Sequence, residues 1–138
     1  MKFSGDEFLS KLPLALVMAA VETDIIDRSL VVRFTRPGNR NPLSVSVLSE
    51  LHKIIDDCEN YEGLSAIIFS GTGNVFASGA DLREIAAVTP ATAAEFARNG
   101  QALMYMIAAL PQPPIAAING YCFVGGLDLA PASERRVT

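Results

Sequence analysis

The sequence is poor in the residues that build metal sites, disulfide frameworks and nucleic-acid surfaces. It contains one histidine, His52, and two cysteines, Cys58 and Cys122, among 138 residues. The cysteines stand in apolar segments without a CxxC motif, so no familiar zinc spacing occurs and both thiols are expected to be reduced and buried. Lysine and arginine form no cluster, and the net charge is −4. We therefore expect no metal site and no nucleic-acid partner.

Long apolar runs are also missing. The most apolar segment, residues 12–21, is about half of the roughly 20 residues that a transmembrane helix requires. Asp6 and Glu7 precede it where a signal peptide carries basic residues, so we interpret the segment as part of the folded domain. These absences predict a cytoplasmic protein that does not interact with membranes.

Apolar residues are nevertheless abundant overall. Half of the residues are hydrophobic, 19% are charged, and the mean hydropathy is +0.31. A chain of this size buries roughly 68–70% of the surface that it exposes when unfolded, so residues 1–138 are expected to form one domain without disulfides. The apolar excess also predicts a surface that a partner subunit or further chain covers.

Strand-like and helix-like segments alternate, which is typical of an α/β fold. Strands are expected at residues 16–23, 30–35, 64–69, 115–118 and 135–138, and helices at 81–87, 89–110 and 126–133. A further helix is expected to open at Asn41-Pro42, because asparagine caps free amides and proline suits the first helical position. Its apolar stripe consists of Leu43, Val47, Leu48, Leu51, Ile54, Ile55 and Cys58, and Glu50 falls off that stripe.

Two glycine-containing junctions, residues 76–82 and 119–129, attract attention as candidate chemistry. Each follows a predicted strand and leads into a predicted helix, whose first amides are unpaired donors at the positive end of the helix dipole. We predict that one amide from each junction binds a common oxygen as an oxyanion hole, and that Asp128 acts as a base or holds a water. The alternative is that these are ordinary connections, with Asp81 and Asp128 only as helix-start acids.

Other catalytic arrangements find less support in the sequence. Residues 70–73 lack the lysine and the spacing of a phosphate-binding loop and predict a hairpin-type turn. Ser78 does not stand in a GxSxG motif, and the distant His52 is interpreted as a residue on a helix flank, which argues against a serine hydrolase.

Three segments, in matching order and spacing, resemble the enoyl-CoA hydratase/isomerase (crotonase) family. They are Arg36-Pro37 with Asn41-Pro42-Leu43, then IIFSGTGNVFASGADL (residues 67–82), then PPIAAINGYCFVGGLDL (residues 113–129). The resemblance runs from about Leu16 to the last residue. It implies a spiral of ββα units, of which this chain is the N-terminal half of an incomplete domain. The C-terminal helical part and the second catalytic acid would lie beyond Thr138.

The resemblance also implies roles for individual residues. The oxyanion-hole amides would be those of Ala80 and Gly125, and Asp128 would be the first catalytic acid. Coenzyme A is implied as part of the acyl-CoA substrate, with no covalently bound cofactor and no metal. Full-length subunits would form trimers or hexamers. The residues that would contact CoA are Gly38, Asn39 and Arg40 along its nucleotide end, and Ser78, Ala80, Asp81 and Leu82 around its pantetheine and adenine.

The sequence departs from the family at several positions. Val124 replaces the first of three glycines, Glu134 replaces an aspartate, and Pro131 lies one turn into the last helix, where proline can cost about 3 kcal/mol. An aspartate at Asp128 resembles dienoyl-CoA isomerases more than hydratases.

These features leave three interpretations open. The first is an enoyl-CoA hydratase or isomerase of fatty-acid or related acyl-CoA metabolism that stabilises an enolate. The second is a non-catalytic, truncated acyl-CoA-binding remnant. The third is an interaction module, whose apolar excess would serve assembly.

Overall fold

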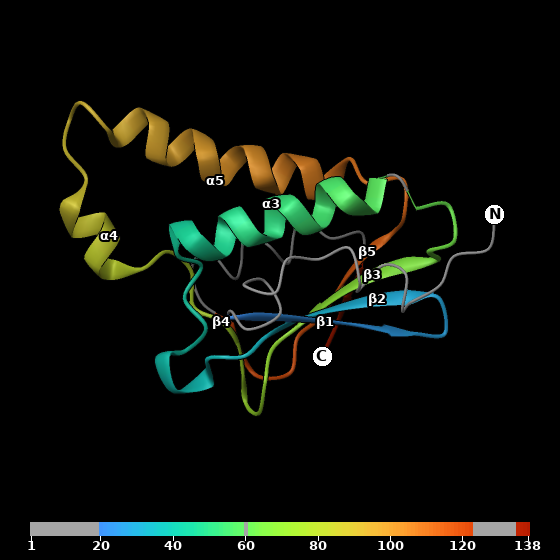
Figure 1. Ribbon diagram of the computed structural model, residues 1–138. Coiled ribbons are helices and arrows are strands. Elements are labelled where there is room, and N and C mark those ends of the chain that lie inside the picture. The colour runs from blue at the N-terminus through green and yellow to red at the C-terminus, as the bar shows by residue number, and fades with distance from the viewer. Residues whose placement is uncertain (1–19, 60, 123–134) are drawn as a thin grey trace.

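The computed structural model describes residues 20–59, 61–122 and 135–138, in which two long helices lie on one side of a sheet (Figure 1). The helices are α3 (Val45–Glu59), α4 (Leu82–Ala87) and α5 (Ala93–Ala108), with a 3-10 turn at Pro37–Asn39. The strands are β1 (Val21–Ile26), β2 (Ser29–Phe34), β3 (Ala66–Ser70), β4 (Val75–Ala77), β5 (Pro114–Ala117), β6 (Tyr121–Cys122) and β7 (Arg135–Val137). The predicted α/β alternation is confirmed.

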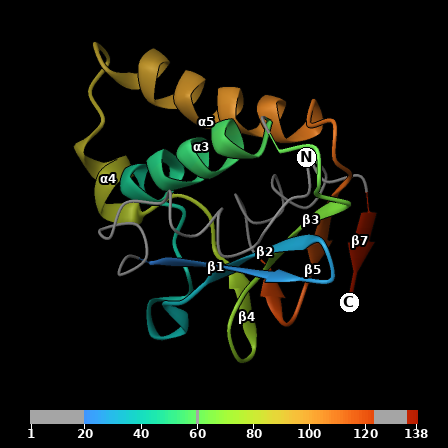
Figure 2. The same cartoon turned by 45° about the vertical axis from the view of Figure 1, so that its right-hand side comes forward.

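The strands form two sheets between which the chain alternates. The larger has the order β1-β2-β3-β5-β7, and the smaller pairs β4 with β6. All pairs are parallel except β1 with β2. The strands β3 and β5 thus join the large sheet, and the strand that follows each of them turns into the small one (Figure 2).

The strand β1, the first of the hairpin that begins the fold, ends later than the sequence predicts. The turn of this hairpin consists of Asp27 and Arg28, whose φ angles of 47° and 68° are those of a two-residue type I′ turn. The predicted strand 16–23 therefore continues to Ile26, and residues 16–19 lie outside the described residues. The polar Asp24 hid this extension, because it occupies the exposed face of an edge strand.

The predicted start of the helix α3 at Asn41-Pro42 is wrong. The helix begins at Val45, and the Oγ of Ser44 accepts a hydrogen bond from the Val47 amide at 3.3 Å. Asn41 has a φ of 47°, and its buried side chain bonds elsewhere. Tertiary hydrogen bonds therefore override the capping signal of Asn41, and Ser44 takes that role.

The core lies between the large sheet and the helices α3 and α5, which the two views place side by side (Figures 1 and 2). The predicted apolar stripe of α3 is buried except for the half-buried Leu48. Phe34 of β2 meets Phe76 of β4 edge to face, with ring centroids 6.0 Å apart, and so joins the two sheets. The largest fully buried side chains are Phe34, Phe69, Phe76, Leu30, Leu51, Ile54, Ile55, Ile67, Leu103 and Ile107.

Several other boundaries differ from the prediction. The helix α5 begins at Ala93 and not at residue 89, because Thr89 and Thr92 form a turn of their own, in which the Thr89 amide donates to the Thr92 Oγ1 at 3.0 Å. The strands β4 and β6 are additions, since two or three residues are too few to show a periodic pattern. The predicted helix 126–133 lies outside the described residues. In the part of the chain that the structure describes, no helix has the length and apolarity needed to span a membrane.

Candidate active site

The first glycine junction is held against the segment that enters α3. Leu43 donates its amide hydrogen to the carbonyl oxygen of Gly79 at 2.6 Å, and Ser78 donates to the carbonyl of Asn41 at 3.3 Å. These bonds form a short parallel bridge between Pro42 and Gly79. Gly79 has a φ of 94°, a conformation that an L side chain rarely adopts. The glycine therefore lets the chain turn from β4 towards α4 at this point.

The backbone around Ala80 directs its amide away from Leu43, in the segment that enters α3. In the trans peptide that links Gly79 to Ala80, the carbonyl and the N–H point in opposite directions. Because the Gly79 carbonyl faces the Leu43 amide, the Ala80 N–H must face the other way. Ala80 is half-buried, and its amide makes no hydrogen bond to any other described residue. Among the described residues, therefore, no acceptor competes with a ligand for this amide.

Asp81 occupies the position that begins α4. Its carboxylate accepts a hydrogen bond from the Arg83 amide at 2.8 Å and lies 3.7 Å from the Arg83 guanidinium. The interpretation of Asp81 as a helix-start acid is confirmed. Leu82 follows it with 80% of its surface exposed.

Asn119 joins the second junction to the turn after β3. Its Oδ1 accepts from the Gly71 amide at 2.8 Å, and its Nδ2 donates to the carbonyls of Gly73 and Val75 at 2.8 and 3.1 Å. The sequence analysis placed this residue in the second junction but gave its side chain no role. A signal was present, because an asparagine between a strand and a glycine is typical of side chains that bond to backbone groups.

The strands β4 and β6, which overlap the two junctions, lie side by side in the small sheet. Ala77 of β4 is paired with Cys122 of β6 in a parallel arrangement. Gly125 and Asp128, predicted as the second oxyanion donor and the acid, lie outside the described residues. In the sequence, Ala80 follows Ala77 by three positions, and Gly125 follows Cys122 by three positions.

Asn41 fixes the loop that the resemblance assigns to CoA. Its Oδ1 accepts from the Arg36 amide at 2.7 Å, and its Nδ2 donates to the carbonyls of Val75 and Phe76 at 3.2 and 3.1 Å. The side chain is buried, with 3% of its surface exposed. The loop 37–40 is thus tied at one end to β4, the strand that leads to Ala80.

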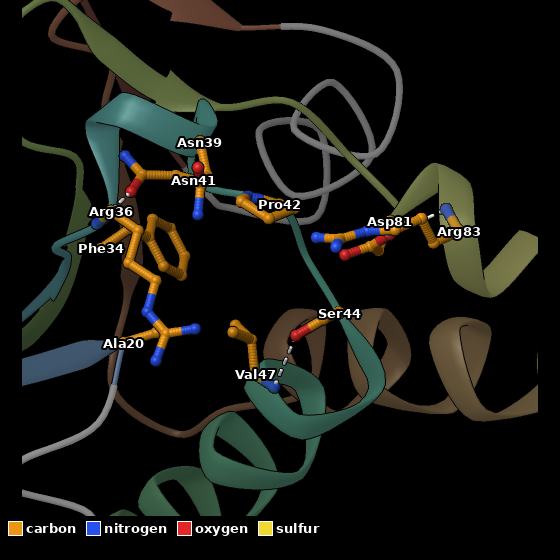
Figure 3. A pocket seen from close by; sticks show the side chains of 10 residues that line it. All are labelled: Ala20, Phe34, Arg36, Asn39, Asn41, Pro42, Ser44, Val47, Asp81 and Arg83. Atoms are coloured by element: carbon orange, nitrogen blue, oxygen red, sulfur yellow. Dashed lines mark hydrogen bonds and ion pairs between the residues drawn. The ribbon is translucent and has the colours of Figure 1, made fainter.

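The predicted CoA-binding residues divide between two hollows. Asn39 and Asp81 line one of about 60 Å³, in which Arg36 extends towards Val47 (Figure 3). Arg83 lies on the Asp81 side of the same hollow (Figure 3).

The second hollow, of about 440 Å³, is lined by Gly38 and Arg40 together with Pro37, Asn74, Val75 and Tyr121. The structure therefore brings Asn39 to Asp81 but places Gly38 and Arg40 against the turn after β3. Ser78 is half-buried in the bridge to Asn41.

Glu50 of α3 lines neither hollow, but it interacts electrostatically with Arg36, which lines the first. Glu50 of α3 is half-buried where the apolar pattern predicts exposure. Burial raises the pKa of its carboxyl, while the positive charges of Arg36 and Lys53 act in the opposite direction. No group of three or more His, Cys, Asp or Glu able to hold a metal occurs within residues 20–59, 61–122 and 135–138.

The two thiols are free, as predicted, but only one is buried. Cys58 of α3 is fully buried, and burial, with a smaller contribution from Asp57, raises its pKa to about 12. Cys122 of β6 is half-buried, which corrects the prediction of full burial, and this partial burial raises its pKa less. His52 is half-buried on the flank of α3, in agreement with the sequence analysis.

Comparison with known proteins places this geometry in context. A family model described as "Enoyl-CoA hydratase/isomerase" matches residues 27–137. The "Probable enoyl-CoA hydratase" of Bacillus subtilis is 36% identical over 113 residues, covering 81% of this chain and 44% of the relative. The "Putative enoyl-CoA hydratase" of Thermus thermophilus is 36% identical over 107 residues, covering 75% and 42%. The chain spans less than half the length of these relatives.

Solved structures show the same fold. The enoyl-CoA hydratase from Bacillus anthracis has a TM-score of 0.81 and 30% identity, over 86% of this chain and 46% of that one. The enoyl-CoA hydratase from Thermoplasma volcanium has a TM-score of 0.79 and 28% identity, over 85% and 47%. The predicted crotonase-like α/β fold class is therefore confirmed.

Proposed function

Because the chain belongs to the enoyl-CoA hydratase/isomerase family, we propose that it binds an acyl-CoA thioester and stabilises its enolate. In this proposal the amides of Ala80 and Gly125 donate to the thioester oxygen. The names of the two curated relatives, both enoyl-CoA hydratases, support the choice of substrate class. The proposed setting is fatty-acid or related acyl-CoA metabolism in the cytoplasm.

The parallel pairing of Ala77 with Cys122 is the observation that carries the proposal. Neighbouring strands lie about 4.7–4.9 Å apart, so β4 and β6 lead towards Ala80 and Gly125 from that separation and in the same direction. An oxyanion needs donors about 2.7–3.1 Å away, which two amides with a starting separation of this size can provide together. In this proposal the Ala80 N–H, which bonds to no other described residue, supplies one of them.

The chemistry follows from where charge develops. When an acyl-CoA loses a proton beside its carbonyl, or gains a nucleophile across its double bond, negative charge accumulates on the thioester oxygen. Two fixed amides bind that charged oxygen more strongly than the neutral carbonyl, which lowers the barrier. One such donor lowers the activation free energy by about 2.7–4 kcal/mol. We assign Asp128 as the acid that exchanges a proton with the substrate or holds a water.

We place the nucleotide end of CoA over the hollow shared by Asn39 and Asp81. Arg36 and Arg83 line it and offer positive charge to phosphate groups. Gly38, Arg40, Ser78 and Leu82 belong to the segments that flank these residues, and we retain them as further contacts of the CoA body. From family membership we also propose a trimer or hexamer of the full-length protein.

The test compares a ligand that forms an enolate with one that has no thioester. Acetoacetyl-CoA and free CoA are titrated by calorimetry against the chain and against Gly125→Pro, which removes the proposed donor. Gly125→Ala, which keeps the amide, is the matched control. We expect proline to weaken the binding of acetoacetyl-CoA by about tenfold or more, the size of one hydrogen bond to a charged group, and alanine to have a much smaller effect.

Equal affinity of both variants for acetoacetyl-CoA would overturn the oxyanion assignment, and failure of the unaltered chain to bind either ligand would overturn the proposed function. Binding without turnover of an enoyl-CoA would identify this chain as the acyl-CoA-binding form without catalysis.

A further inference from the structure

A single hydrogen bond links α4 to the beginning of α3. The Val45 amide, the first of α3, donates to the carboxylate of Glu84 at 2.9 Å, across 39 positions of the sequence. Figure 1 shows α4 beside this N-terminal end of α3. The contact is a charge-assisted hydrogen bond between two secondary-structure elements that are far apart in the chain.

The bond from Val45 to Glu84 gives α3 a negative charge at its N-terminus, which its own first turn does not provide. The first turn of α3 contains no acidic residue, although a negative charge there stabilises a helix. Ser44 accepts from the Val47 amide, which leaves the Val45 amide to be satisfied from elsewhere. The Glu84 carboxylate provides both the acceptor and the negative charge.

Hydrophobic packing does little to hold α4 in place. The helix has six residues, none of which is buried, and Leu82 and Ile85 are 80% and 46% exposed. A helix this short is not stable by itself. Its position must therefore depend on specific bonds at its ends.

Those bonds bracket Ala80. On one side Leu43 donates to the Gly79 carbonyl, and on the other Val45 donates to Glu84, so amides two positions apart hold both flanks of the junction. We propose that Glu84 is a positioning residue that keeps α4, and through it the Ala80 amide, in the orientation required for the thioester oxygen. This inference rests on the proposed function for its ligand, but its structural part can be tested without one.

The first experiment is ligand-free. Hydrogen–deuterium exchange of residues 78–84 is compared in the unaltered chain, Glu84→Ala and Glu95→Ala. Glu95 is the matched control. It is also an acidic residue in the first turn of a helix, α5, and with Val45 and Glu84 it lines a third hollow, beside α4. We expect faster exchange of residues 78–84 in Glu84→Ala only, with β2 and β3 unchanged. Equal exchange in the two variants overturns the inference.

The second experiment measures the affinities for acetoacetyl-CoA and free CoA. Glu84→Ala is expected to lower the affinity for acetoacetyl-CoA by about tenfold, which corresponds to one charged hydrogen bond. The affinity for free CoA is expected to fall much less. Glu84→Gln retains an acceptor oxygen and is expected to recover part of the loss. A merely structural role would lower both affinities alike, and that result would overturn the positioning role.

Val45→Pro removes the donor itself. Proline is well suited to the first position of a helix, so α3 is expected to remain intact. If the two residues act through one bond, Val45→Pro combined with Glu84→Ala weakens acetoacetyl-CoA no further than either change alone. Additive losses would contradict the inference. If the unaltered chain fails to bind, the proposed function falls, and the exchange data still decide whether Glu84 positions the junction.

Discussion

Asn119 accepts the amide hydrogen of Gly71 on its Oδ1 at 2.8 Å, and this bond joins the turn after β5 to the turn after β3. The Nδ2 of the same side chain donates to two carbonyls of the second turn. One side chain thus holds together the two chain segments that lead to the proposed oxyanion donors.

Replacing Asn119 with alanine is expected to lower the free energy of unfolding by about 1–3 kcal/mol, because its three hydrogen bonds to backbone groups are lost. Urea denaturation measures the change. Asn99→Ala, at an exposed position of α5, is the control and is expected to stay within about 0.5 kcal/mol. If the two variants lose the same stability, Asn119 does not hold the turns together.

Gly71 and Gly120 are positions where no side chain fits. A Cβ at Gly71 would lie 1.9 Å from the carbonyl oxygen of Val75, and one at Gly120 would lie 1.9 Å from that of Asn74. Alanine at either position must displace backbone, so we expect a loss of about 1–3 kcal/mol or more in thermal or urea unfolding. Gly100→Ala in α5 meets no atom within 4 Å and is expected to gain about 0.5–1 kcal/mol. A tolerated Gly71→Ala would show that the turn after β3 is built differently.

Asn41 combines a left-handed backbone with a buried, fully engaged side chain. Asn41→Ala removes three hydrogen bonds and keeps the unfavourable φ of 47°, whereas Asn41→Gly removes the bonds and relieves the backbone. We expect both to be destabilised, with glycine more stable than alanine by about 1–2 kcal/mol. Urea unfolding of the pair separates the two contributions. A glycine variant as stable as the unaltered chain would show that the side-chain bonds contribute nothing.

Cys58 is expected to make stability depend on pH in the alkaline range. Burial raises its pKa from the ordinary 9.0 to about 12, so the folded state favours the neutral thiol. The unfolded chain loses this proton first as pH rises, and the contribution is present below pH 9 and lost between 9 and 12. Unfolding free energies of the chain and Cys58→Ala, compared across this range, should therefore converge. A difference in unfolding free energy that stays constant from pH 9 to 12 would contradict the raised pKa of Cys58. In a separate measurement, a thiol reagent at neutral pH should modify the half-buried Cys122 before the buried Cys58.

The predictable part of the fold consists of segments with their own periodic signal. The apolar stripe of α3 and the apolar run that becomes β3 predict those elements, because residues buried in a long helix or strand recur at a regular spacing in the sequence. Short elements escape this logic. The strands β4 and β6 have three and two residues and exist through pairing with each other.

The residues of the first junction of the candidate site could be recognised from the sequence but their arrangement could not, and Gly125 and Asp128 of the second junction lie outside the described residues. The Ala80 junction is recognisable from its glycine and from Asp81, which starts the next helix. What holds it there is long-range, because Asn41 bonds to Phe76 across 35 positions and Glu84 bonds to Val45 across 39. The preference of asparagine for helix caps reflects local interactions, and the long-range hydrogen bonds of the Asn41 side chain outweigh it.

The bridge between Pro42 and Gly79 has a consequence for which parts of the chain tolerate insertions. An extra residue between 77 and 81 would shift the first junction relative to the segment that enters α3, and one between 71 and 76 would displace the carbonyl groups that accept from Asn41 and Asn119. The connection between α4 and α5, residues 88–92, has no such ties to the rest of the described fold, since the bonds of Thr89 and Thr92 are local. Changes of length, or a grafted tag, are best accommodated there.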